Sequence, residues 1–122
     1  MRPEDRDSAS LWDMLEAARA VVRILGECTA GEFTGESGDV VRSAVERTLE
    51  VLGEAARRMS EGFQERHPEV PWKDLVGLRN VISHQYEKVD YGEIYRICRE
   101  RIPMLVEQLS PLVPPAPDVR EL

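Results

Sequence analysis

The sequence predicts an all-α protein folded as an up-and-down bundle of four to five helices. Apolar residues recur at intervals of three and four along most of the chain, and the polar segments between them are short. Nowhere do apolar and polar residues alternate as in a half-buried strand. A chain of 122 residues fits one domain. We expect a helical domain over residues 8–110 and a proline-rich tail over residues 111–122 that is extended or disordered.

The first helix is predicted over about residues 8–28. Ser10 with Asp13 three residues later is typical of a helix start. The apolar stripe of this helix consists of Leu11, Met14, Leu15, Ala18, Val21, Val22 and Leu25. Three glycines within residues 29–38 then predict a loop.

The second helix is predicted over about residues 39–59, with Asp39 as its N-cap. Its apolar stripe consists of Val41, Ala44, Val45, Thr48, Leu52, Ala55, Ala56 and Met59. Gly53 lies inside this helix at a cost of about 1 kcal/mol relative to alanine, so we expect a close helix crossing there. Glu54 follows on a largely apolar turn, where it is either solvated or orients a functional side chain of the neighbouring helix.

Three more helical segments are predicted in the second half of the chain. A short turn of helix within residues 60–66 is followed by a proline-containing break. A helix over about residues 72–83 comes next, with Trp72 packed as a lid on the core. Asp90 should cap the last helix, and Pro103 should kink or split it. The apolar stripe of that helix consists of Ile94, Ile97, Cys98, Ile102, Leu105 and Leu109.

The charge of the chain limits the kind of nucleic-acid contact that it can make. The formal net charge is −7, which argues against a broad nucleic-acid surface. Residues 1–50 carry six basic against eleven acidic side chains, whereas residues 57–101 carry nine against eight. A local basic cleft on an acidic body is therefore possible, with a short RNA contact. The same charges also fit a solvated helix face with ion pairs.

Composition also bears on location and on cofactors. The start of the chain lacks the apolar run of a signal peptide, and no stretch approaches the ~20 apolar residues that span a bilayer. We expect a cytoplasmic protein without a membrane partner. Cys28 and Cys98 are too few and too far apart for a zinc site, and both are predicted to be small buried hydrophobic residues. No histidine pair has metal-ligand spacing, so neither a metal nor a cofactor is expected.

The densest group of reactive side chains consists of Arg79, Asn80, Ser83, His84 and Tyr86. A guanidinium binds two phosphate oxygens at once, and an imidazole exchanges protons near neutral pH. If the helix continues to residue 83, a step of about 100° per residue places Asn80 within about 40° of His84, whose ring it could orient. In the alternative interpretation, Arg79 pairs with a surface carboxylate and His84 is a half-buried structural residue.

This segment resembles the motif of the HEPN superfamily, specifically its HepT-like toxin branch. In that motif an arginine is followed by four residues, a histidine, one residue and a tyrosine, which here are Arg79, His84 and Tyr86, with Asn80 beside the arginine. The resemblance covers about residues 11–109. Further segments that resemble the family in the same order are residues 52–56, 68–72, 76–80 and 89–90.

The resemblance implies a ribonuclease toxin with RNA as its substrate and a minimal nucleotidyltransferase as its antitoxin. It implies catalytic roles for Arg79 and His84, with Asn80 beside them, and transfer of AMP from the partner to Tyr86. RNA cleavage by 2′-hydroxyl attack needs a base, an acid and positive charge on the phosphate, but no metal. One chain offers a single histidine of this kind. The resemblance implies a homodimer that faces two motifs across one cleft.

Two neighbouring residues are candidates for supporting the motif. Glu54 could orient Arg79 or His84 from the adjacent helix, and Ser83 directly precedes the histidine. The alternative function, from a different class, is a non-catalytic helical dimer that binds a nucleotidyltransferase or nucleic acid and has lost the nuclease role.

Overall fold

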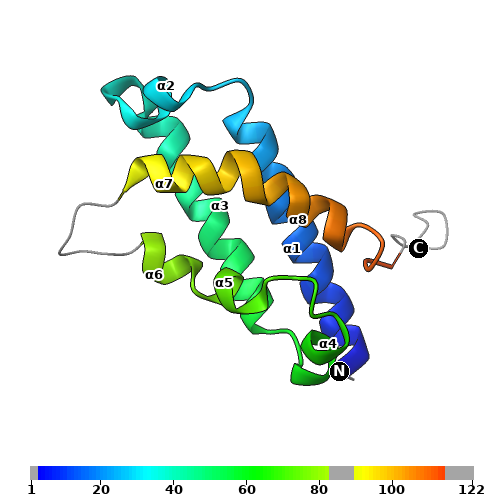
Figure 1. The fold of residues 1–122 in the computed structure, drawn as a ribbon. Helices are drawn as coiled ribbons and strands as arrows, with labels where there is room; N and C mark the ends of the chain where they lie inside the picture. Colours follow the sequence, from blue (N-terminus) through cyan, green and yellow to red (C-terminus); the bar gives the residue numbers. More distant parts are fainter. Residues whose placement is uncertain (1–2, 83–89, 115–122) are drawn as a thin grey trace.

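The computed structural model of the protein describes residues 3–82 and 90–114 (Figure 1). These residues form helices and turns with no strand among them, so the predicted all-α class is confirmed. In chain order the elements are α1 (Pro3–Leu25), α2 (Ala30–Thr34), the 3₁₀ turn η1 (Glu36–Gly38), α3 (Asp39–Arg57), α4 (Glu61–Arg66), α5 (Trp72–Val76), α6 (Leu78–Ile82), α7 (Tyr91–Arg96), the π turn η2 (Ile97–Arg101) and α8 (Ile102–Leu109).

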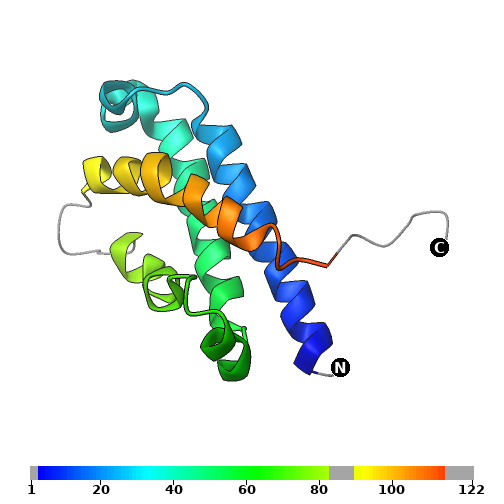
Figure 2. The ribbon, with the colours of Figure 1, turned by 45° about the vertical axis from the view of Figure 1, so that its right-hand side comes forward.

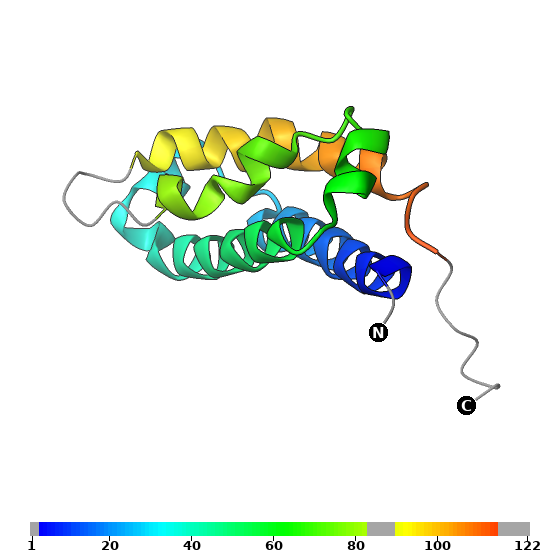
Figure 3. The same cartoon turned by 90° about the horizontal axis from the view of Figure 1, so that it is seen from below.

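The elements form two layers, which Figure 3 shows from below. Helices α1 and α3 lie side by side in one layer, and α5, α6 and the rod α7–η2–α8 form the other. The short elements α2 and η1 lie at one end of the bundle and α4 lies near the other (Figures 1 and 2). The main rods run up and down in chain order, as predicted.

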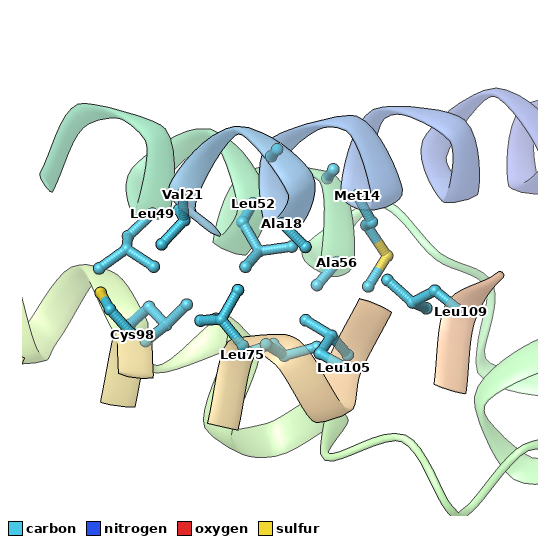
Figure 4. Close-up of a cluster of buried hydrophobic side chains, with 14 of the residues drawn as sticks. Met14, Ala18, Val21, Leu49, Leu52, Ala56, Leu75, Cys98, Leu105 and Leu109 are labelled. Atoms are coloured by element: carbon cyan, nitrogen blue, oxygen red, sulfur yellow. The ribbon is translucent and has the colours of Figure 1, made fainter. Parts of the chain in front are cut away.

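The core fills the space between these layers, and Figure 4 shows part of it. Side chains from both layers meet there, among them Met14, Ala18 and Val21 of α1, Leu49, Leu52 and Ala56 of α3, and Leu75, Cys98, Leu105 and Leu109 of the other layer. Burying one such leucine stabilises the fold by about 1.5–3 kcal/mol. The predicted stripe of the first helix is buried except for Val22, which is 41% exposed.

Helix α1 begins at Pro3, earlier than the predicted start near residue 8. Ser10 is buried within the helix rather than beginning it. The first turns of α1 are tied to the start of α4 by a tertiary contact, in which the carboxylate of Asp7 accepts hydrogen bonds from the backbone N–H and the hydroxyl of Ser60 at 2.9 and 2.6 Å. Ser60 in turn caps α4 by accepting from the N–H of Phe63 at 3.2 Å. The predicted helical turn within residues 60–66 is confirmed.

The loop predicted for residues 29–38 is wrong in part, since it contains α2 and η1. Thr29 and Glu32 form a capping box that begins α2. The prediction relied on the three glycines of this segment and missed it. Asp39 is the first residue of α3 and not its N-cap, a position that Gly38 holds. A Cβ at Gly38 would lie 2.2 Å from the carbonyl oxygen of Glu32, so this packing requires glycine.

The close helix crossing predicted at Gly53 is confirmed. A Cβ built on Gly53 would lie 2.8 Å from the carbonyl oxygen of Leu75 and 3.7 Å from the Cβ of Leu78. The absent side chain therefore lets the α5–α6 segment approach the backbone of α3. Glu54, the next residue, is thereby placed beside α6.

Replacing Gly53 by alanine should destabilise the protein although alanine favours helix. The methyl group would meet a backbone carbonyl, which cannot move aside as a flexible side chain can. Overpacking against a backbone atom should cost about 2–3 kcal/mol, the upper part of the usual range, and the helix gains about 1, so we expect the free energy of unfolding to fall by about 1–2 kcal/mol. Urea denaturation measures it. Gly31→Ala is the matched control, because nothing lies within 4 Å of a Cβ there. Equal stability of Gly53→Ala and wild type would contradict the crossing.

The helix predicted over residues 72–83 is divided into α5 and α6 by a turn at Gly77. The carbonyl of Gly77 accepts from the N–H groups of both Asn80 and Val81, at 3.0 and 3.3 Å, which tightens the chain at this point. The periodicity of the apolar residues did not reveal this turn. Trp72 is buried as predicted, and its indole N–H donates to the carbonyl of His67 at 2.8 Å.

The last rod follows the prediction closely. The carboxylate of Asp90 accepts from the N–H of Glu93 at 3.1 Å and caps α7. The N–H of Ile102 donates to the carbonyl of Ile97, which makes the π turn η2. This wider turn ends beside Pro103, whose ring cannot donate and would clash in a regular α-helix. The predicted splitting at the proline is thus confirmed.

Packing continues beyond α8, because Leu112 and Val113 lie partly buried against the core. Residues 115–122 of the predicted tail lie outside the described residues. Cys98 is buried as predicted, whereas Cys28 is only half-buried. No helix in the described part of the chain is long and apolar enough to cross a membrane.

Candidate active site

Helix α6 carries the first part of the predicted catalytic motif. Arg79 and Asn80 are its second and third residues, and both side chains are exposed. Ser83, His84 and Tyr86 lie outside the described residues. The structure therefore places Arg79 and the neighbouring amide of Asn80, and the arrangement of the histidine and tyrosine stays a prediction.

Arg79 lines a groove of about 450 Å³ between α6 and α3. Glu54, the predicted supporting residue, lines the same groove. The other residues that line it are Arg47, Glu50, Val51 and Arg58. Arg47, Val51, Glu54 and Arg58, the residue that caps α3, follow one another at intervals of four, three and four, and Glu50 lies three residues after Arg47; this is the spacing of one helix face. The crossing at Gly53 brings this face beside α6.

Glu54 is ionised in the groove and is held mainly by Arg57. The hydrogen bond that Nη2 of Arg57 donates to Oε1 of Glu54, at 2.6 Å, lowers the pKa of this carboxyl. The positive charges of Arg57, and to a smaller extent of Arg58 and Arg79, lower that pKa further. Glu54 therefore acts on Arg79 through its charge, while its hydrogen bond goes to Arg57.

The side chain of Arg79 takes part in no ion pair or hydrogen bond with residues 3–82 and 90–114. The surface carboxylate that the alternative interpretation requires as its partner is thus not found within those ranges. An exposed guanidinium beside other arginines in a groove can bind an anion, and its planar fork fits two oxygens of a phosphate.

The sequence did not single out the other charged residues of this groove, Arg47, Glu50 and Arg58. They entered the prediction only as part of the overall charge. Their spacing with Glu54 along one face of a predicted helix was a usable signal. What the sequence could not supply is that Arg79, on a separate helix, lies across from this face.

Other reactive side chains among the described residues have structural surroundings. No group of three histidine, cysteine or acidic side chains in the described part could hold a metal ion. His67 stacks on the ring of Phe63 at 4.4 Å, and its Nδ1 lies 3.3 Å from Oε1 of Glu69, which fits a structural role. Burial raises the pKa of the Cys98 thiol to about 12, so this thiol is not a nucleophile near neutral pH.

Comparisons with known proteins agree on one family. Residues 14–112 match the protein family described as ribonuclease HepT-like. The chain is 38% identical over 102 residues to "Putative RNase MJ1380" of Methanocaldococcus jannaschii, covering 84% of this chain and 92% of the relative. It is 30% identical over 95 residues to "Probable ribonuclease HepT" of Thermococcus cleftensis, covering 78% and 84%. No solved structure gives a significant match.

Proposed function

Because this chain belongs to the ribonuclease HepT-like family, we propose that it is the toxin of a toxin–antitoxin pair, a metal-independent endoribonuclease that acts in the cytoplasm. Its antitoxin would be a minimal nucleotidyltransferase. The observation that carries the proposal is the exposed Arg79 in a groove with two further arginines, within the region that matches the family.

The proposed reaction uses the side chains of the motif. His84 accepts the proton of the ribose 2′-hydroxyl, and the 2′-oxygen attacks the phosphorus atom. The bond from phosphorus to the 5′-oxygen breaks, and this oxygen leaves with a proton from a second histidine. The products carry a 2′,3′-cyclic phosphate and a 5′-hydroxyl. Arg79 stabilises the charge on the phosphate oxygens, and Asn80 fixes the ring of His84.

The need for two proton-transferring groups supports a homodimer, since each chain supplies one such histidine. A two-fold interface would face two motifs across a single cleft. Exposed apolar side chains on the segment that carries the motif also support it, since Val76 of α5 is 39% exposed and Val81 of α6 is 38% exposed. Both would lose contact with water in an interface.

Digestion of single-stranded RNA by the purified protein tests the proposed function. We expect cleavage in the presence of EDTA, products that end in 2′,3′-cyclic phosphate, and activity in the fraction that light scattering identifies as dimeric. Loss of activity with EDTA and its return with one divalent metal would overturn the mechanism. No cleavage under any condition would favour the non-catalytic helical dimer.

A further inference from the structure

The groove between α3 and α6 contains more guanidinium groups than a single phosphate needs, although its two carboxylates leave a net charge of +1. Arg47, Arg58 and Arg79 contribute three guanidinium groups, and Glu50 and Glu54 contribute two carboxylates. Val51 is the one apolar side chain among the lining residues. The core of a protein–protein interface is more apolar than this and depleted in charge, so the lining favours an anionic ligand over a partner protein.

Within the described part of the chain, Arg47 of α3 and Arg58 at the end of this helix are held only by weak ion pairs. Arg47 lies 3.6 Å from Glu50, and Arg58 lies 3.5 Å from Asp13. The side chains of the arginines are 77% and 50% exposed, and exposed pairs of this kind contribute about 0–1 kcal/mol. A phosphate could therefore replace either carboxylate at little cost.

Structural arginines in the same chain are held differently. The guanidinium of Arg42 donates to the carbonyls of Phe33 and Gly35 and lies 4.4 Å from the ring centre of Tyr91. Arg99 donates to carbonyls that follow α1. These two arginines hold the fold together, whereas those of the groove are available to a ligand.

We propose that this groove binds the phosphodiester backbone of single-stranded RNA on both sides of the phosphate held by Arg79, with Arg47 and Arg58 as binding residues. The inference rests on the proposed function and names how its substrate is held. Arg58 lies eleven positions after Arg47 along α3 and its C-cap, which is roughly 17 Å at 1.5 Å per residue. A stacked strand that rises ~3.4 Å per nucleotide along its axis would place about five nucleotides along that length.

The carboxylates of the groove should affect RNA affinity in the opposite direction from the arginines. Glu50 holds Arg47 and repels a phosphate, so its neutralisation should strengthen RNA binding while loss of the arginine weakens it. If the Arg47–Glu50 ion pair had only a structural role, replacing its arginine and replacing its glutamate would not change RNA affinity in opposite directions.

Fluorescence anisotropy with wild-type protein and labelled 2′-O-methyl oligouridylates of increasing length tests the inference, because these probes lack the hydroxyl that cleavage requires. We expect affinity to rise with length up to about five nucleotides and then level off. Arg47→Gln and Arg58→Gln should each weaken binding roughly tenfold. Each should also reduce the slope of log affinity against log salt by about 0.7. Glu50→Gln should tighten binding.

The matched controls are Arg19→Gln and Glu16→Gln. These residues form an exposed ion pair three residues apart on α1, 3.9 Å between charged atoms, as Arg47 and Glu50 do on α3. Neither lines the groove, so both variants should bind the oligonucleotides as wild type does. Melting curves should be unchanged for all variants.

Three results would overturn the inference. In the first, Arg47→Gln and Arg58→Gln bind the oligonucleotides as tightly as wild type. In the second, Arg19→Gln loses as much oligonucleotide affinity as they do. In the third, Arg47→Gln and Arg58→Gln weaken only a complex with an acidic partner protein. If the arginines support oligonucleotide binding but unmodified RNA is not cut, the proposed function falls and this inference stands. If RNA is cut but replacing Arg47 and Arg58 leaves oligonucleotide affinity unchanged, the proposed function stands and this inference falls.

Discussion

Purified His84→Ala protein should cleave no RNA, while its helix content and melting temperature remain those of the wild type. The imidazole is the group proposed to move the 2′-hydroxyl proton, a task for which a positioned acid or base contributes ~10²–10⁴-fold. Arg79→Ala should lower kcat by about 10²–10³, as loss of one charge-stabilising group does elsewhere. Its stability should hardly change, because Arg79 makes no ion pair in the described part of the chain. Digestion of a labelled RNA together with thermal melting provides both measurements.

His67→Ala is the matched control for the histidine. Its ring packs on Phe63 at the end of α4, so its loss should lower the melting temperature and leave kcat unchanged. Arg79→Lys separates charge from shape, since lysine keeps the charge but not the planar fork, and we expect it to recover only part of the lost activity. Full activity of His84→Ala would remove the histidine from the mechanism.

Co-expression with the cognate nucleotidyltransferase should add one or more AMP units at Tyr86 and silence the ribonuclease. Each added group would bring a negative phosphate close in sequence to Arg79 and His84, where it would compete with the phosphate of RNA. The added group would both fill the space for the RNA phosphate and repel its negative charge, so both effects would inhibit cleavage. Tyr86→Phe should fold normally, stay active and remain toxic in the presence of the partner. Intact-mass measurement of the co-expressed proteins, followed by RNA digestion, provides the readout.

Tyr91→Phe is the control for this prediction. Tyr91 begins α7 and its ring lies under the guanidinium of Arg42, a contact that phenylalanine preserves. This variant should still be modified and silenced. If the partner neutralises the toxin completely while Tyr86 stays unmodified, inhibition works by binding alone.

The architecture could be read from the sequence where periodicity and local chemistry agree. The apolar stripes placed the long helices, and Asp90 and Pro103 placed the beginning and the interruption of the last rod. Gly53 was informative because a glycine inside a strong helix pattern is costly and so indicates a close backbone contact.

What the sequence did not reveal depends on contacts between distant residues. The first turns of α1 are tied to the start of α4 by the hydrogen bonds that Asp7 accepts from Ser60, and no local signal in the sequence reports a partner 53 residues away. The groove likewise exists only where the α3 face lies opposite Arg79. The turn at Gly77 between α5 and α6 was not predicted, because the apolar residues keep their helical spacing across it.

The bond between Asp7 and Ser60 has a consequence for how the chain can be shortened or extended. The first turns of α1 supply the acceptor that fixes the start of α4, so they cannot be trimmed like an ordinary loose terminus. Removing them would leave a half-buried hydroxyl and a backbone N–H without their carboxylate, at roughly 1–3 kcal/mol each. An expression tag therefore belongs ahead of an intact residue 3, and truncation that begins past Asp7 would loosen the end of the bundle where α4 lies.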